Sequence, residues 1–149
     1  MEPQSIDESS GELTITFEPD ASSKDLDAVN AGLSAYNDRV LGPQQYEPMR
    51  LLVRDAEGQI VGGLLGELYY NWLYIAILWL HEDIRGQGLG RRLMATAEAY
   101  AASRGRTHVH VDTLDFQAPL FYQRLGYTVW GELGPYGDGH TRYYLKKAL

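Results

Sequence analysis

Apolar and polar side chains follow two clear periods near the start of the chain. Residues 13–17 alternate as in a half-buried strand. Residues 24–40 place apolar side chains every three or four positions, which predicts an amphipathic helix that Ser22 or Ser23 can cap. Gly42 and Pro43 then end the helical pattern. The chain therefore opens with a predicted strand and helix.

The middle of the chain carries strand patterns separated by turn residues. Strands are predicted over residues 50–55, 59–70 and 72–81. Glu57-Gly58 supplies the first turn and Asn71 the second, and both connections are short enough for hairpins. We therefore expect an antiparallel meander.

A helical period returns after the meander. Residues 89–104 form an amphipathic pattern that Gly105 ends, followed by an alternating strand at 107–112. A short helix with Pro119 in its first turn is expected over 119–125. Two final strands are expected over 127–132 and 141–146, joined by a glycine-rich loop.

The order of these elements predicts an α/β (α+β) fold: a mixed, mostly antiparallel sheet of about six to seven strands flanked by helices. The chain has 149 residues, of which 44% are hydrophobic, enough for one domain with its own core. We assign this domain to residues 13–149. Residues 1–12 are polar and acidic, and we expect them to form a flexible tail.

Charge and composition narrow the functional classes. The formal net charge of -7 argues against a nucleic-acid partner bound through a basic surface. With no cysteine, the chain has no disulfide, thiolate nucleophile or cysteine zinc site. The first residues lack the pattern of a signal peptide, and the apolar run at 72–80 is too short to cross a membrane. We therefore expect a cytoplasmic protein without a membrane partner.

The most informative segment joins the third meander strand to the next helix. Gly86, Gly88 and Gly90 alternate immediately before the helix, and Arg85, Arg91 and Arg92 add positive charge. Glycine permits close backbone approach, and a helix start offers unpaired N–H groups, so the segment predicts a pyrophosphate site. The spacing fits neither the dinucleotide fingerprint nor the P-loop. A tight structural turn is the plainer alternative.

Two motifs resemble those of the GCN5-related N-acetyltransferase superfamily. Arg85-x-x-Gly88-x-Gly90 is similar to its Q/R-x-x-G-x-G/A motif, and Leu78 to Asp83 is similar to the strand that precedes it. Ala118-x-x-x-Tyr122-x-x-x-Gly126-Tyr127 resembles its second signature. The resemblance follows the element order over residues 13–149 and is specific over 78–92 and 118–127. It implies an acetyltransferase that uses acetyl-coenzyme A.

The resemblance also implies roles for individual residues. Backbone N–H groups of Gln87 to Gly90 would hold the pyrophosphate, and Trp79 and Leu80 would pair with the pantetheine arm. Separation of the strands at 72–81 and 107–112 would open a slot for the thioester. Tyr122 would act as general acid toward the leaving thiolate, although its ring could instead be a core contact. The expected cofactor-binding set is Trp79, Leu80, Arg85, Gly86, Gln87, Gly88, Leu89, Gly90 and Arg91.

Asp115 departs from the family pattern, which often has asparagine there, and could cap the short helix. Four residues are candidate bases for the amine proton: Glu67, Glu82, Asp112 and His140. We take Glu82 and Asp112, with Tyr122, as the candidate catalytic set. Glu82 could also merely replace a proline common at this point, and Asp112 could be a turn residue.

The resemblance places the acceptor pocket at the helix over 24–40, so Tyr36 and Asn37 are candidate substrate-binding residues. His140 joins them, in a glycine-rich loop that could form a lid. The alternative interpretations are that Tyr36 packs in the core and that His140 is a solvent-exposed loop residue. His108 and His110 share one strand face, but with no third ligand evident we expect no metal site.

Transfer of an acetyl group to a primary amine, in a small molecule, is the leading interpretation. A coenzyme A-binding sensor with little catalysis is the alternative from another class, and the presence of Tyr122 favours the enzyme. A protein N-acetyltransferase also stays open. A homodimer is compatible with the open sheets of the family.

Overall fold

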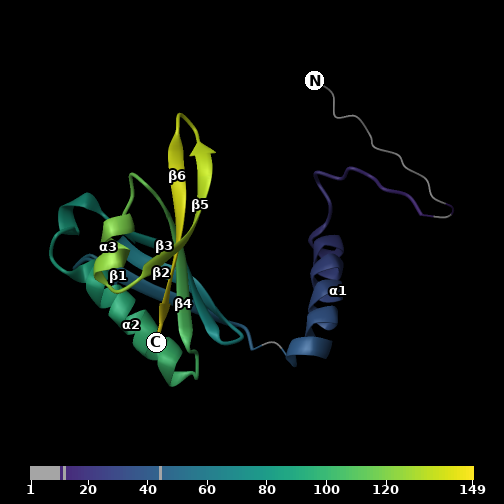
Figure 1. Cartoon of the computed structure of the whole chain (residues 1–149), viewed down its shortest axis with the longest axis horizontal. Coiled ribbons are helices and arrows are strands. Elements are labelled where there is room, and N and C mark those ends of the chain that lie inside the picture. Colours follow the sequence, from purple (N-terminus) through teal and green to yellow (C-terminus); the bar gives the residue numbers. More distant parts are fainter. Residues whose placement is uncertain (1–10, 12, 44) are drawn as a thin grey trace. The chain divides into compact units, whose positions relative to one another are not determined.

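The computed structural model describes residues 11, 13–43 and 45–149, and the chain divides into two compact units, Met1–Gln44 and Gln45–Leu149 (Figure 1). Our expectation of a single domain over residues 13–149 stays an expectation. The expected tail at 1–12 lies outside the described residues, apart from Gly11.

The described residues of the first unit form one helix, α1 (Ser23–Leu41). Ser22 caps it, because its hydroxyl oxygen accepts a hydrogen bond from the Asp25 N–H at 3.2 Å. At the other end Gly42 has a φ of 79°, and its N–H donates to the Asp38 carbonyl. The predicted helix and its cap are therefore confirmed.

The predicted strand at 13–17 is wrong. Leu13 makes an isolated bridge and residues 14–17 have no regular structure. Alternation alone does not make a strand, since each strand needs a neighbour to complete its hydrogen bonds.

The second unit is built on a six-stranded sheet with the order β1-β2-β3-β4-β6-β5. Only the β3–β4 pair is parallel among the described strands, so the sheet is mixed and mostly antiparallel, as expected. The strands are β1 (Glu47–Arg54), β2 (Ile60–Tyr69), β3 (Trp72–Leu80), β4 (His108–Leu114), β5 (Thr128–Tyr136) and β6 (His140–Ala148).

Two α-helices and one short 3-10 helix connect these strands. The short helix η1 (Glu82–Ile84) follows β3, and α2 (Leu89–Ser103) leads to β4. Helix α3 (Pro119–Arg124) lies between β4 and β5. No helix in the part of the chain that the structure describes combines the length and the apolar character needed to cross a membrane.

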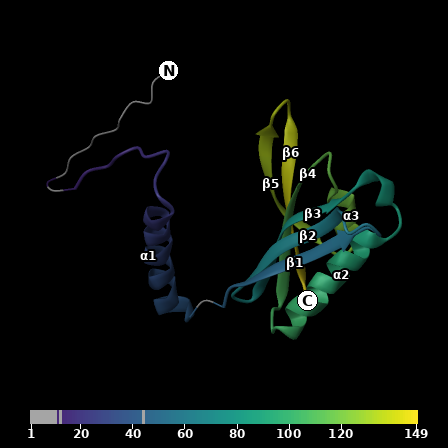
Figure 2. The same cartoon turned by 180° about the vertical axis from the view of Figure 1, so that it is seen from behind.

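The core of the second unit lies between one face of the sheet and α2 (Figure 2). Met94, Ala97 and Ala101 of α2 are buried against strand side chains such as Ile75 and Val111. Alternate residues of β3 and β4 therefore face α2, and the residues between them occupy the opposite face of the sheet. We call this opposite side the outer face.

The loop expected between the last two strands is shorter than predicted. Strand β5 continues through Tyr136, and the turn that leads to β6 contains residues 137–139, with Gly137 and Gly139 at positive φ. The glycines therefore serve a hairpin turn.

Candidate active site

Strands β3 and β4 separate part-way along their length. Their parallel pairing runs from Trp72↔His108 to Ile75↔Val111 and stops there, although both strands continue. A bulge marks the same point: Gly66 pairs with Ile75 and Leu65 with Ile77, which leaves Ala76 without a partner in the β2–β3 register. The expected slot between these strands is confirmed.

A cavity of about 790 Å³ occupies this separation. Its walls are residues 75–80 of β3, the loop and helix start around residues 85–91, residues 111–113 of β4, and α3 with the segment before it. This volume is in the range of small-molecule sites. Gly90 of the glycine-rich segment and Tyr122, which are 32 residues apart in sequence, therefore line one cavity.

The glycine-rich segment presents bare backbone to the cavity. Gly86 and Gly88 have φ values of 74° and 79°, and a Cβ added to either would stand in open space. Gly88 is the N-cap of α2, and no side chain caps this helix start. Unpaired N–H groups at the start of a 15-residue helix favour an anion, so the segment fits a pyrophosphate group.

Gly90 has a different reason to be glycine. It is buried, and a Cβ there would meet the Phe121 ring at 3.3 Å. The small residue thus lets α2 and α3 approach each other closely beside the cavity.

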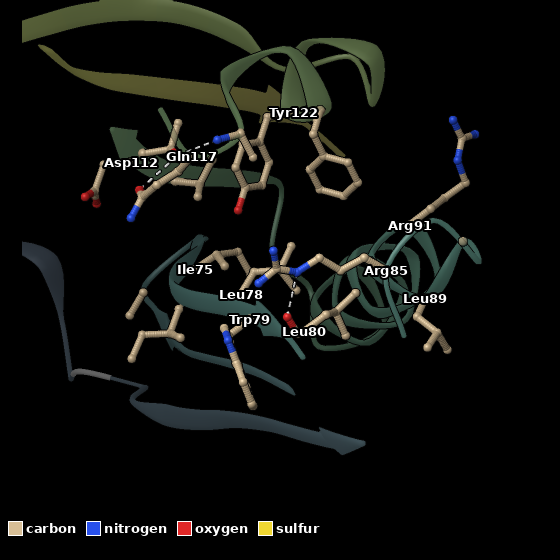
Figure 3. Close-up of a pocket in the computed structure, with 18 of the residues that line it drawn as sticks. Ile75, Leu78, Trp79, Leu80, Arg85, Leu89, Arg91, Asp112, Gln117 and Tyr122 are labelled. Atoms are coloured by element: carbon tan, nitrogen blue, oxygen red, sulfur yellow. Dashed lines mark hydrogen bonds between the residues drawn. The ribbon is translucent and has the colours of Figure 1, made fainter. Parts of the chain in front are cut away.

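The side chain of Tyr122 points from α3 toward Ile75 and Leu78 of β3 (Figure 3). Its ring is buried, with 5% exposed, and packs edge to face against Phe121 and Tyr127. Its hydroxyl makes no hydrogen bond to another described residue. Burial, and to a smaller extent the Asp112 carboxylate, raises the pKa of Tyr122 from 10.0 to about 12. The hydroxyl therefore keeps its proton at neutral pH.

Comparison of the sequence with known protein families shows to which family the chain belongs. Residues 17–127 match the model of the acetyltransferase (GNAT) family. The chain belongs to this family. It is therefore an acetyl-transferring enzyme, and acetyltransferases of this family use acetyl-coenzyme A.

Three relatives show how far the likeness extends. Acetyltransferase Atu2258 of Agrobacterium fabrum is 34% identical over 120 residues, which cover 80% of this chain and 88% of the relative. Blasticidin-S acetyltransferase of Streptomyces morookaense is 44% identical over 93 residues, covering 62% of this chain and 68% of that protein. The crystal structure of an acetyltransferase from Bacillus cereus matches with a TM-score of 0.79 and 29% identity, over 90% of this chain and 98% of that one.

The arginine of the first motif has a structural partner in this acetyltransferase. Arg85 Nε donates to the Leu80 carbonyl at 2.9 Å, which ties the glycine-rich segment to the end of β3 (Figure 3). One lone pair of the Leu80 oxygen is thereby occupied. Trp79 points away from Tyr122 and is 46% exposed, so its indole lies on the outer face while its backbone lines the cavity.

Asp112 lines the cavity with its carboxylate already engaged. Oδ1 accepts a hydrogen bond from the Tyr74 hydroxyl at 3.0 Å, and Oδ2 is ion-paired with Arg142 Nη1 at 3.0 Å. The guanidinium in turn lies over the Tyr136 ring at 4.9 Å. Asp112 therefore joins β3, β4 and β6 at the point where the slot opens.

Asp115 does not cap α3. Its Oδ1 lies 2.9 Å from His140 Nδ1, and its Oδ2 accepts from the Thr141 N–H at 3.1 Å. These contacts lower the pKa of Asp115, with the Thr141 N–H as the largest cause. The N-cap of this helix is instead Ala118, and no side-chain hydrogen bond caps the helix. The interpretation of Asp115 as a helix cap is wrong.

Gln117 shapes the chain before α3, a role that the sequence did not reveal. Its Oε1 accepts from the Leu114 N–H at 2.8 Å and from the Thr113 hydroxyl at 3.2 Å. The Thr113 oxygen accepts from the Ala118 N–H at 3.3 Å. The turn that carries Tyr122 to the cavity is therefore held by side-chain bonds to backbone.

The remaining predicted residues lie elsewhere. Glu82 is exposed in η1 and does not line the cavity, and His140 begins β6 in contact with Asp115. Tyr36 and Asn37 lie on α1, in the other unit. Gln87, the ninth member of the expected cofactor-binding set, is not among the residues that line the cavity. Ten predicted residues line it: Trp79, Leu80, Arg85, Gly86, Gly88, Leu89, Gly90, Arg91, Asp112 and Tyr122.

Proposed function

We propose that this acetyltransferase transfers the acetyl group of acetyl-coenzyme A to a primary amine of a small molecule. The observation that carries the proposal is the cavity where β3 and β4 separate, with a glycine-rich helix start at one wall and a buried tyrosine hydroxyl at another. The blasticidin-S acetyltransferase of Streptomyces morookaense, by its name, acetylates a small molecule and is 44% identical over the aligned 93 residues.

The proposed cofactor contacts follow from the backbone. N–H groups of residues 87–90 hold the pyrophosphate, and Gly86 and Gly88 leave open space beside these groups because they carry no side chain. Beyond Ile75 the edge of β3 has no β4 partner, so its free backbone groups can pair with the pantetheine arm in the manner of an added strand. Arg85 holds the glycine-rich segment next to the end of β3 through its hydrogen bond to the Leu80 carbonyl.

Bound acetyl-coenzyme A supplies a thioester carbonyl to be attacked and a thiolate to leave. Tyr122 is placed to give that thiolate its proton, because its hydroxyl points into the cavity, is free of other bonds to described residues and stays protonated at neutral pH. An unpaired backbone N–H near the Ala76 bulge is the donor proposed for the oxyanion. Asp112 positions Tyr74 and Arg142, since its two oxygens are already engaged.

The proposal is tested in two steps with the full chain. Acetyl-coenzyme A binding is measured by calorimetry, and thiol release is then followed with a panel of amines that includes blasticidin S, an aminoglycoside, a polyamine and a peptide with a free N-terminus. Mass spectrometry checks the panel for the gain of one acetyl group. Acetylation of a small amine well above the peptide supports the proposal. Peptide acetylation alone favours a protein N-acetyltransferase, and binding without any transfer favours a coenzyme A sensor.

A further inference from the structure

A row of polar and aromatic side chains crosses the outer face of the sheet beside the slot. Glu67 pairs with Tyr74, Tyr74 with His110, and His110 with Lys146, so the row runs over β2, β3, β4 and β6. His110 comes one residue before Val111, where the pairing of β3 and β4 ends. The row therefore lies at the closed end of the slot, on the face opposite α2.

His110 is held by ring contacts and leaves its nitrogens available. Its imidazole stacks on the Tyr74 ring with centroids 4.8 Å apart and planes at 20°, and the Trp72 ring meets it edge-on at 5.5 Å. It is half-buried, and neither ring nitrogen makes a hydrogen bond to another described residue. This fixes the orientation of the ring without using its lone pair.

The other three histidines all have polar partners. His140 Nδ1 lies 2.9 Å from Asp115 Oδ1, and His108 Nδ1 lies 2.8 Å from the Thr107 hydroxyl. His81 Nδ1 accepts from the Asp83 N–H at 3.2 Å. Within the described part of the chain, His110 thus differs from every other histidine.

Burial favours the neutral form of the His110 imidazole. Burial lowers its pKa from 6.5, while the carboxylates of Asp112 and Glu67 act in the opposite direction and do not cancel the effect. Tyr74 faces it from β3, and burial raises the pKa of Tyr74, which remains a neutral donor to Asp112. On the same face of the sheet lie His108 on its own strand and Lys146 and Tyr144 on β6.

We infer that His110 is the proton acceptor for the amine in the transfer proposed above. The amine nitrogen forms a bond to the acetyl carbonyl carbon, the carbon–sulfur bond breaks, and the nitrogen's proton passes to the unprotonated ring nitrogen of His110, directly or through one water. The thiolate takes its proton from Tyr122. His110 then returns its proton to solvent and Tyr122 regains one from solvent, so both side chains recover their starting charge and the atoms balance.

The competing acidic side chains are less well placed. Both oxygens of Asp112 are engaged, and Glu82 is exposed in η1, which follows the end of β3 that lies away from Ile75. Glu67 is one strand farther from the slot than His110, with Tyr74 between them in the register. Its carboxylate is better placed to attract a cationic amine than to take its proton.

The inference rests on the proposed function and is tested with His110→Gln, with His108→Gln as the matched control. His108 lies on the same face of the same strand and also stacks on an aromatic ring, Trp72, at 4.7 Å. The probe is blasticidin S, or the panel amine acetylated fastest if blasticidin S is inert. For each variant kcat and kcat/KM are followed from pH 5 to 9, and acetyl-coenzyme A binding is measured by calorimetry.

Wild type is expected to show a break in its pH profile below pH 6.5, where His110 gains a proton. His110→Gln is expected to remove this break, to lower kcat at pH 7 by roughly a hundredfold, and to leave acetyl-coenzyme A affinity unchanged. His108→Gln should keep the break and change kcat less than about threefold. The inference is overturned if His110→Gln retains the break, if Glu67→Gln alone removes it, or if cofactor binding falls with kcat. If wild type acetylates no amine at all, the proposed function fails, and this inference fails with it.

Discussion

Tyr122 and Tyr127 pack ring against ring, with centroids 5.8 Å apart and planes at 70°, yet their hydroxyl groups have different surroundings. The Tyr127 hydroxyl donates to Glu98 Oε1 of α2 at 2.7 Å, and Glu98 Oε2 accepts from Lys147 Nζ at 2.9 Å. The Tyr122 hydroxyl faces the cavity without a described partner. One tyrosine thus joins α2 to the sheet, and its neighbour is available for chemistry.

This contrast predicts opposite effects of removing each hydroxyl. Tyr127→Phe should lower the free energy of unfolding by about 1–2 kcal/mol, because a half-buried carboxylate loses a donor, and should leave acetyl-coenzyme A affinity unchanged. Tyr122→Phe should change stability by less than about 0.5 kcal/mol and lower kcat by at least about tenfold. Urea unfolding and steady-state kinetics of both variants check this. Equal losses of stability would contradict it.

The raised pKa of Tyr122 predicts a loss of stability in alkali. Below pH 10 the residue is protonated in both the folded and unfolded states. Between pH 10 and about 12 the unfolded state releases this proton first, so the folded state loses about 1.4 kcal/mol for each pH unit from this group. Tyr127, whose pKa is also raised, adds to the loss in wild type. Urea unfolding at pH 9 and pH 11 should therefore show a drop smaller by about 1 kcal/mol in Tyr122→Phe than in wild type.

Gly88 and Gly58 form a matched pair for testing the pyrophosphate site. Their φ values are 79° and 83°, and a Cβ on either meets no protein atom within 4 Å, but only Gly88 lines the cavity. Alanine at either position should therefore cost about 1 kcal/mol of stability through backbone strain. Gly88→Ala should also weaken acetyl-coenzyme A binding at least about tenfold.

Calorimetry measures the affinity of the two glycine variants for acetyl-coenzyme A. Unchanged affinity in Gly58→Ala shows that backbone strain alone does not affect binding. Unchanged affinity in Gly88→Ala as well would mean that the glycines serve only the turn between β3 and α2.

Local patterns explain which parts of this site the sequence predicted. The glycines and Arg85 lie within a few residues of one another, so their spacing indicated the helix start without knowledge of the fold, and the anion site there stays a proposal. The cap of α1 at Ser22 was readable for the same reason. The strand at 13–17 failed because alternation does not reveal whether a neighbouring strand is present to pair with it.

Contacts between distant residues explain what the sequence missed. Tyr74 and His110 meet only because β3 and β4 are parallel neighbours, and nothing local distinguishes His110 from His108. Asp115 carries the right side chain to cap a helix but contacts β6, which is distant along the chain. Asp112 was a reasonable base until the structure showed two donors on its carboxylate.

The Asp112 ion pair gives the last prediction, since it separates a positioning role from that of a base. Asp112→Asn turns one acceptor oxygen into an amide donor that must face Arg142 or the Tyr74 hydroxyl, so stability should fall by about 1–3 kcal/mol. Arg142→Met should also destabilise, because it leaves the carboxylate, whose side chain is 17% exposed, without its cation. In the double variant neither charge remains, and the combined loss should be smaller than the sum by about 1 kcal/mol or more, as urea unfolding of all four proteins would show. The Asp112→Asn enzyme should keep the break at acid pH in its kcat profile, because His110 still accepts the proton. If instead the stability losses of the two single variants add up in the double variant and the break is absent, Asp112 is the base.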